Sequence, residues 1–493
     1  MIKIPSQLRY HLPFFLILVV AIFLRVYKLP ILTTFGRDQG IDFLTVREMI
    51  VTRRPTLLGI KVSLADFHQG PVYLYLLLPL FMLFKLHPLA GPVTAVIIAG
   101  LTLVALYLFM AKFFGRSAAV LSSLLFAVSP ELVKQGNTPL YQHFLSLTII
   151  LSFWALFIFL EAQTKFKKRG WAVILGVLVG ISLELHFLAI ILCLALPLFI
   201  LVKDKKQWRY LPIYLAGLII GTSPTILFEV RHQFLNTHLL WQYLGASAAD
   251  TTLPDKLDKL MTWIIGAGNW FGAEQLLGGG IILVMSSLGL IGLRLTQPRA
   301  KALRQLFVIT TIVTLLFQLV MTSFISHYAL PVWLLLIILF PLWLTELARK
   351  NKPLAYLAAA IIIIANLSAV SSHFSQNHGY AMPAGWSLNK ILAAAIVIKE
   401  DSLERQQVNV ASLLDGDTRA YPLRYTLAWQ QVKLEAVEKY PDSLVLYVVT
   451  KRTREQLMNS SEWEIAAFQP AVVGQEWDMG DQIKLYRLEK ANF

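Results

Sequence analysis

The sequence contains few charged residues for its length. Only 15% of its 493 residues are charged, whereas about a quarter are charged in soluble domains. Hydrophobic residues make up 56% of the chain, and the mean hydropathy is +0.62. This composition excludes an ordinary soluble enzyme of this size, because many apolar side chains would remain in water. It favours a protein whose main solvent is lipid.

Cysteine is almost absent, and the marks of several other protein classes are missing. Cys193 is the single cysteine and lies within an apolar run, which excludes an internal disulfide and a Cys-x-x-Cys metal site. The sequence has no Gly-rich nucleotide-binding loop and no internal repeat. No small-residue cleavage pattern follows the first apolar run, 12–29, so we expect this run to remain as an anchor helix.

Acidic residues are scarcer than basic ones, at 29 against 44, which gives a formal net charge of +15. A large positive charge can indicate a nucleic-acid partner. Here, however, the lysines and arginines form short clusters between apolar runs, as they do in the cytoplasmic loops of membrane proteins. We therefore interpret the charge as membrane topology and expect no nucleic-acid partner.

Nine apolar runs are long enough to cross a bilayer, which needs about 20 residues for roughly 30 Å of hydrocarbon. They are 12–29, 88–113, 117–131, 141–163, 210–228, 278–295, 304–324, 329–347 and 354–371. The stretch 171–202 has basic clusters at both ends, so we expect a hairpin of two helices that turns near Leu185. Together these segments predict eleven transmembrane helices.

The basic clusters also predict the orientation. The apolar segment 71–86 suits either a short span or an interfacial helix. If it does not span, all five basic clusters that follow it fall on the same side as the N-terminus, as the positive-inside rule requires of the cytoplasm. We expect a multi-pass protein of the cell membrane with a cytoplasmic N-terminus. Two long loops, 30–87 and about 229–277, are then extracytoplasmic.

The last part of the chain has a different pattern. Apolar strand-like runs alternate with helical stretches there: 408–413, 418–431, 443–449, 452–460 and 483–488. This alternation is typical of a small α/β domain. The predicted fold class is an all-α polytopic membrane domain, residues 1–372, followed by a small extracytoplasmic α/β domain, residues 373–493.

Ionisable residues next to apolar segments are candidates for function, because charge is costly at membrane depth. Asp38 follows the first helix closely, so its carboxylate could act as a general base at the membrane surface. The alternative is that Asp38 caps a helix that begins at Gln39. Asp42 and Glu48 are expected on the surface of that helix, paired with nearby arginines.

Further polar residues are expected at the same membrane level. Glu131 could bind an acceptor or a metal, or it could simply pair with Lys134. Glu184 and His186 lie at the tip of the predicted hairpin and could bind phosphate or metal, or could form a satisfied polar turn. Tyr328 precedes a late helix and could line the same cavity.

A cationic pair follows the seventh predicted helix. Arg231 and His232 would lie at the outer membrane surface, where an arginine is less expected and suits a lipid phosphate. The alternative is an interface anchor that forms a salt bridge with Glu229.

These landmarks, in this order, resemble the GT-C membrane glycosyltransferases that use lipid-phosphate sugars. The resemblance is to the family 39 group, which includes protein O-mannosyltransferases and lipid A aminoarabinose transferases. The motifs that carry it are Asp38-Gln39, Gly70-Pro71-Val72-Tyr73 and Tyr328-Ala329-Leu330-Pro331. Two residues depart from the family pattern: Gln39 stands where Glu is common, and Gly70 replaces the first proline of the second motif.

The resemblance implies an inverting transfer on the extracytoplasmic face. Asp38 would be the catalytic base, and the donor would be a polyprenyl-phosphate-linked sugar, so no soluble nucleotide sugar is expected. The acceptor would be a protein, a lipid or a glycan. The candidates for binding the donor phosphate are Arg231, His232, Arg37 and His68, and those for an acceptor or secondary site are Glu131, His186 and Tyr328. No cofactor is required; some GT-C enzymes use a divalent metal, but no ligand cluster here has suitable spacing, so none is predicted.

Two other functions fit the same hydropathy. A non-catalytic transporter or flippase for lipid-linked sugars would usually carry charges midway through its helices or break helices at corresponding positions in two halves, and neither pattern is present. A ligase or polymerase of lipid-linked polymers usually has its large outer loop later in the chain, and the loop at 229–277 keeps this alternative open.

Overall fold

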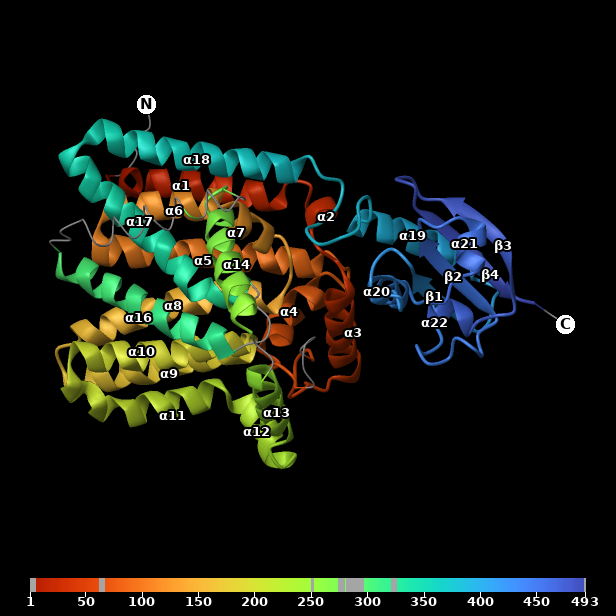
Figure 1. The fold of residues 1–493 in the computed structure, drawn as a ribbon, viewed down its shortest axis with the longest axis horizontal. Helices are drawn as coiled ribbons and strands as arrows, with labels where there is room; N and C mark the ends of the chain where they lie inside the picture. The colour runs from red at the N-terminus through yellow and green to blue at the C-terminus, as the bar shows by residue number, and fades with distance from the viewer. Residues whose placement is uncertain are drawn as a thin grey trace.

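The computed structural model describes residues 6–61, 67–249, 252–273, 280, 297–320 and 326–491. A long helical bundle forms most of the molecule, and a smaller domain built on a sheet lies at one end of it (Figure 1). We call the end of the bundle next to this domain the proximal end and the opposite end the distal end.

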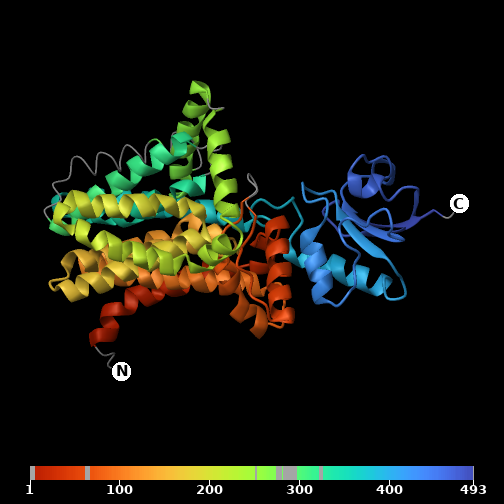
Figure 2. The same ribbon diagram turned by 90° about the horizontal axis from the view of Figure 1, so that it is seen from below.

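The helices of the bundle run along the long axis of the molecule (Figures 1 and 2). They are α1 (Ser6–Val26), α5 (Ala90–Phe114), α6 (Arg116–Val128), α8 (Tyr141–Glu161), α9 (Lys165–Leu185), α10 (Ile190–Lys203), α11 (Leu211–Gly221), α16 (Pro298–Val320), α17 (Leu330–Lys350) and α18 (Lys352–Phe374). Because most of them are apolar all round, they need either other helices or lipid on every face.

Five of the described helices are long and apolar enough to cross a membrane, and a sixth span is possible if the bent pair on either side of residue 222 counts as one. The chain is therefore a multi-pass membrane protein. The expected hairpin in 171–202 is present, since α9 ends at Leu185 and α10 begins at Ile190. The run predicted at 278–295 lies outside the described residues, apart from Gly280, so eleven spans remain a prediction.

Shorter helices cross the proximal end of the bundle or project from it (Figures 1 and 2). They are α2 (Leu29–Leu32), α3 (Arg37–Thr52), α4 (Val72–Leu83), α7 (Pro130–Gln135), α12 (Ser223–Arg231), α13 (Leu235–Ala249) and α14 (Leu253–Asn269), with 3-10 turns η1 (Phe187–Ala189), η2 (Lys205–Tyr210) and η3 (Ser326–Ala329). The ambiguous segment 71–86 contains α4, whose 12 residues are too few to cross a bilayer.

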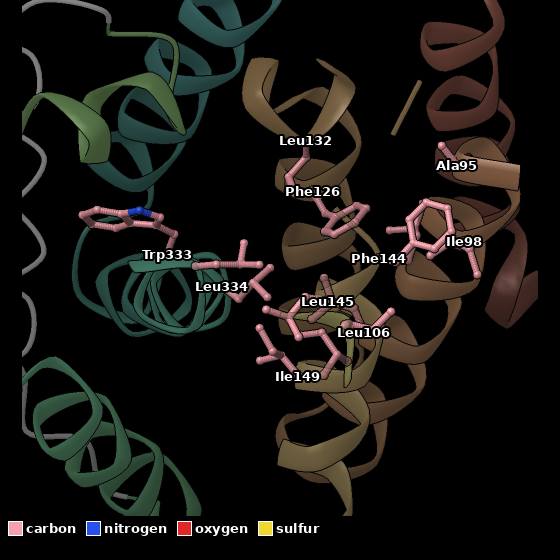
Figure 3. Close-up of a cluster of buried hydrophobic side chains, with 14 of the residues drawn as sticks. Ala95, Ile98, Leu106, Phe126, Leu132, Phe144, Leu145, Ile149, Trp333 and Leu334 are labelled. Carbon is pink, nitrogen blue, oxygen red and sulfur yellow. The ribbon is translucent and has the colours of Figure 1, made fainter. Parts of the chain in front are cut away.

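The core of the bundle lies around α17. In its most apolar window 89% of the residues are buried, against 17% in α18, so α17 is the central helix and α18 faces outward. Figure 3 shows part of this core: Leu334 of α17 points toward Leu145 and Ile149 of α8, whereas Trp333 lies on the other side of α17. Trp333 of α17 is fully buried and its ring lies 4.9 Å from that of Trp263.

A buried arginine, which the sequence analysis did not single out, joins three helices of the bundle. Arg25 of α1 is 1% exposed. Its guanidinium donates to the carbonyl oxygens of Phe126 and Ala127 at the end of α6, at 3.2 Å each, and to that of Leu132 in α7, at 3.1 Å. Arg25 therefore satisfies carbonyl groups that the end of a helix leaves without partners.

The C-terminal domain contains a four-stranded sheet in the order β1-β2-β4-β3, in which β1 and β2 are parallel and the other pairs antiparallel. Its elements are α19 (Leu388–Asp401), β1 (Val408–Ser412), α20 (Tyr421–Trp429), β2 (Val445–Thr450), α21 (Arg454–Met458), α22 (Trp463–Ala466), β3 (Ala471–Asp478) and β4 (Lys484–Lys490). The three predicted strands are present. Strand β3 was missed because its residues are mostly exposed and a bulge interrupts its register, so it lacks a clean alternation of apolar residues.

Helix α20 joins the C-terminal domain to the bundle by packing on α3. The ring of Tyr425 contacts those of Phe35 and Phe43, at 6.2 and 5.3 Å, and its hydroxyl donates to the carbonyl oxygen of Leu86 at 2.6 Å. The backbones also approach closely, since a Cβ atom at Gly40 would lie 2.5 Å from the carbonyl carbon of Tyr421. Helix α3 is thus held between the bundle and the C-terminal domain.

Candidate active site beneath the C-terminal domain

The start of α3 places Asp38 in the first turn of that helix. Gly36 is the N-cap residue, and its backbone N–H donates to Oε1 of Gln39 at 2.9 Å. Asp38 is therefore not the capping residue, which answers the alternative raised from the sequence. Its carboxylate remains near the positive end of the helix dipole, which favours a negative charge.

A second carboxyl group, Asp42, lies one turn further along the same face of α3. The expectation that Asp42 is an exposed residue paired with an arginine is wrong, because it is 1% exposed and, among the described residues, its Oδ2 has no hydrogen-bond partner. The sequence pattern alone did not reveal the burial of Asp42. Helix α3 has mixed polarity, and α20, which comes from a distant part of the chain, packs on this helix. Glu48 is exposed.

The two carboxyl groups differ in their affinity for a proton. Burial raises the pKa of Asp38, and the charge of Arg37 partly opposes this shift. Burial raises the pKa of Asp42 well above its ordinary value, and the nearby charge of Asp38 raises it further. Asp42 therefore holds its proton more strongly, which leaves Asp38 as the carboxylate of the pair.

Two tyrosines accompany this pair. Tyr73 of α4 is buried and donates to the carbonyl oxygen of Pro139 at 2.8 Å. Its ring lies 6.2 Å from that of Tyr141, the first residue of α8. Both tyrosines are close enough to Asp38 and Asp42 to interact with them electrostatically. Three helices that are distant in the sequence thus converge here.

His186 and Tyr328 extend the cluster. The ring of His186 is stacked on that of Tyr141 at 5.2 Å, and it lies 5.8 Å from Tyr328 and 5.2 Å from His327. Burial lowers the pKa of His186 well below its ordinary value. The imidazole is therefore neutral, and because Nδ1 accepts from the N–H of Leu188 at 3.0 Å, its proton lies on Nε2.

The end of the loop before α4 is fixed by two side chains from other parts of the chain. Asn236 of α13 binds the backbone of His68 twice, accepting from its N–H at 2.6 Å and donating to its carbonyl oxygen at 2.9 Å. Oε1 of Gln69 accepts from the N–H of Phe187 at 2.9 Å. His68 is therefore next to the turn that carries His186, although it is not in contact with Asp38 through any described bond.

A buried glutamate lies next to this loop. Glu184 is 1% exposed, and its Oε1 accepts from the N–H of Thr225 in the first turn of α12 at 3.3 Å. A Cβ atom at Gly70 would lie 2.0 Å from Oε2 of Glu184. This gives a physical reason for glycine at position 70, where the family that the sequence resembles commonly has proline. Glu184 occupies the space that a side chain would need.

The proposed phosphate ligands on α12 lie away from the cluster. Arg231 is exposed in the last turn of α12, and the ring of His232 is stacked on Phe228 of its own helix at 4.1 Å. The alternative salt bridge of this pair with Glu229 is not formed within the described residues; Oε2 of Glu229 accepts from the N–H of Thr237 at 3.0 Å. Helix α12 projects from the bundle away from α3 (Figures 1 and 2), and no described contact joins Arg231 or His232 to Asp38, whereas Arg37 is its neighbour in the chain.

Glu131 lies in α7 and is half-buried. Its Oε1 accepts from Nε2 of Gln135 at 3.0 Å, and Lys134 lies over the ring of Tyr380 at 5.3 Å. The alternative pairing of Glu131 with Lys134 is therefore replaced by these contacts. Within the described part of the chain, no group of three or more His, Cys, Asp or Glu side chains is placed to hold a metal ion.

Comparisons with known proteins identify the fold of the chain. The family model for dolichyl-phosphate-mannose-protein mannosyltransferases matches residues 68–228. The crystal structure of ArnT from Cupriavidus metallidurans bound to undecaprenyl phosphate superposes with a TM-score of 0.66 at 14% identity, over 98% of both chains. The chain has a GT-C fold. The resemblance stated from the sequence is thereby confirmed.

Other solved structures extend this likeness. ArnT from the same organism in the apo state gives a TM-score of 0.65 at 14% identity, over 96% of this chain and 97% of that one. The oligosaccharyltransferase of Archaeoglobus fulgidus, in complex with Zn and sulfate, gives a TM-score of 0.54 at 12% identity. This match covers 89% of this chain and 67% of that one. No curated protein matches the chain. The matched family segment, 68–228, does not include Asp38, so the role of this residue depends on its geometry.

Proposed function

We propose that this GT-C protein is a membrane glycosyltransferase that transfers a sugar from a polyprenyl-phosphate donor to an acceptor. The observation that carries the proposal is the pair of carboxyl groups on α3, Asp38 and Asp42, set against the cluster of Tyr141 and His186. ArnT, which shares the fold over nearly its whole length, has been crystallised with undecaprenyl phosphate, and this supports a lipid-linked donor.

The proposed reaction inverts the configuration of the sugar. Asp38 accepts a proton from the acceptor hydroxyl or amine as the oxygen or nitrogen attacks the anomeric carbon, and polyprenyl phosphate leaves with the bonding electrons. Protonated Asp42 and the neutral His186 supply hydrogen-bond donors beside the reacting centre. Tyr328 and Glu131 are the further candidates for contacts with the acceptor or the sugar.

Cations must stabilise the negative charge that develops on the leaving phosphate. Arg37, next to Asp38, and His68, at the fixed end of the loop before α4, are two candidates. Arg231 and His232 lie further away on α12, so we propose that they bind the donor lipid on its approach to the site. No cofactor is required in this mechanism.

We also propose the membrane arrangement that this reaction needs. Eleven helices would span the plasma membrane with the N-terminus in the cytoplasm, and the C-terminal domain, residues 373–493, would lie on the extracytoplasmic side. The basic clusters support this orientation through the positive-inside rule. The proximal end of the bundle, with Asp38 and the loops 30–87 and 229–277, would then meet a donor already carried across the membrane.

The test uses the full-length protein in vesicles that contain polyprenyl-phosphate sugars and a panel of acceptors. Release of free polyprenyl phosphate is measured for the wild type, for Asp38→Asn and for Glu48→Gln, a matched control on the exposed face of the same helix. We expect turnover in the wild type and the control, and a loss of at least about a hundredfold in Asp38→Asn. Equal turnover in Asp38→Asn would exclude Asp38 as the base.

The same vesicles distinguish the two alternative functions. Movement of the lipid across the bilayer without turnover would favour the flippase, and growth of a lipid-linked polymer would favour the polymerase.

A further inference from the structure

A cavity opens at the distal end of the bundle, away from the candidate active site. Its volume is about 410 Å³, and it lies between the ends of α5 and α17 and the starts of α6, α16 and α18. Figure 1 shows the connection between α17 and α18 at the end of the bundle opposite the C-terminal domain. The cavity is therefore separate from the Asp38 cluster and has no role in the proposed reaction.

The mouth of the cavity is polar and cationic. Arg116 is the first residue of α6, and Arg349 lies in the last turn of α17. Glu346 holds Arg349 through an ion pair of 2.5 Å, and Arg116 brings a second guanidinium group to the same cavity. Such planar guanidinium groups suit the oxygens of a phosphate.

The start of α6 adds backbone donors to the same mouth. Gly115 is its N-cap residue, and no side chain caps the helix there. A Cβ atom at Gly115 would meet no atom of the described residues within 4 Å, so these residues leave space beside the N-cap position. The N–H groups and the dipole of this turn favour an anion beside Arg116.

The floor of the cavity is apolar. Leu342 contributes to it from α17, seven residues before Arg349, which corresponds to about 10 Å along a helix. Leu121 lines it from α6, and small side chains keep it open: Ala118, Ala300, Ala355 and Ala359. A phosphate ion alone would fill only the mouth. The combination of a cationic mouth and an apolar floor fits an amphiphile instead.

The cavity also lies where a lipid can enter it. Helix α18, which forms one wall, has only 17% of its apolar window buried and thus faces lipid. Tyr356 lines the cavity and is 69% exposed, and its neighbour Leu357 is 57% exposed. An exposed aromatic side chain near the end of a membrane-spanning helix, such as Tyr356, typically lies at the depth of the lipid headgroups.

We propose that this distal cavity binds one anionic phospholipid. Its phosphate would lie between Arg116 and Arg349, and the first part of its acyl chains along Leu121 and Leu342. Basic pockets between transmembrane helices bind acidic lipid headgroups in this way. The bound lipid would join the start of α6 to the end of α17, the central helix whose other end is next to Tyr328.

The test is native mass spectrometry of the full-length protein, with phosphatidylglycerol or phosphatidylcholine added to the detergent solution. We expect one phosphatidylglycerol to bind in preference to phosphatidylcholine, and Arg116→Gln/Arg349→Gln to weaken this binding by roughly tenfold or more. Lys165→Gln/Lys167→Gln removes the same charge from exposed residues at the start of α9 and should leave the binding unchanged. Equal weakening by both pairs would overturn the proposal, because it would mean that only the general charge attracts the lipid.

A second pair of variants tests the apolar floor without changing any charge. Ala359→Phe fills the cavity, whereas Ala360→Phe is exposed on the same helix. We expect only Ala359→Phe to lose phosphatidylglycerol, and millimolar inorganic phosphate not to displace it from the wild type. Displacement by phosphate, together with full binding by Ala359→Phe, would show a soluble-anion site and overturn the proposal. Thermal unfolding of each variant identifies any that fail to fold. If one set of variants fails to fold, either the charge variants or the alanine variants alone still test the proposal.

Discussion

Gly70 and Glu184 occupy adjoining space, since a Cβ atom at position 70 would lie 2.0 Å from Oε2 of Glu184 and 2.7 Å from its Cα atom. The contact joins the end of the loop before α4 to the tip of α9. Glu184 also accepts from the backbone of Thr225 in α12. One glycine and one carboxyl group thus set how three segments around the candidate site meet.

Gly70→Ala should destabilise the protein by roughly 1–3 kcal/mol, because the added methyl group overpacks a filled site. Gly70→Ala/Glu184→Ala should recover only part of this loss, since the Cα atom of residue 184 remains in the way. Thermal unfolding of the two single variants and the double variant measures the coupling. Gly170→Ala on α9, where a Cβ atom would meet none of the described residues within 4 Å, is the matched control. Purely additive effects would contradict the contact.

The activity of the wild type should fall as the pH decreases through the pKa of Asp38, because a general base must be deprotonated. The charge of Arg37 lowers this pKa against the larger effect of burial. Arg37→Gln should therefore raise the pKa and move the acidic limb of kcat/KM to higher pH. Arg54→Gln, an exposed residue just beyond α3, is the control. A limb that stays in place or moves to lower pH would contradict the assignment.

The catalytic activity should depend on the contact between α3 and α20, because this contact lets the C-terminal domain position α3. In Gly40→Ala the new Cβ atom would lie 2.5–2.6 Å from backbone atoms of Tyr421 and Pro422, so the two helices must separate. We expect kcat to fall more than KM changes, together with faster proteolysis between the bundle and the domain. Gly416→Ala, in an open part of the same domain, should have neither effect. Unchanged kcat in Gly40→Ala would mean that the domain does not position α3.

Asp417 should make the stability of the protein depend on pH. Burial raises the pKa of Asp417 to about 6, and the nearby charge of Asp415 adds to this shift. Since the folded pKa lies above the unfolded value, the favourable contribution is complete below about pH 4 and is lost as the pH rises through 6. Asp417→Asn cannot ionise, so it should unfold at a less pH-dependent temperature and be the more stable form at pH 7, by roughly 3 kcal/mol at most. Thermal unfolding between pH 4 and 7, with exposed Asp442→Asn as control, checks the sign.

The sequence by itself determined the properties that depend on local composition. Long apolar runs indicated helices in lipid, basic clusters at both ends of 171–202 predicted the hairpin of α9 and α10, and alternating runs predicted strands β1, β2 and β4. The position of Asp38 just after the first helix was enough to make it the candidate base. These conclusions needed only neighbours in the chain, because hydrophobic length and charge are local quantities.

Only the tertiary structure decided which residues meet. Asp38, Tyr141 and His186 lie far apart in the sequence, and their convergence depends on how α3, α8 and the tip of α9 pack. The burial of Asp42 depends on its neighbours in space in the same way, and so does that of Arg25. The physical reason is that helices which are apolar all round carry no pattern that marks the face turned to another helix rather than to lipid. The contacts between them are set by the shapes of side chains that come from distant parts of the chain.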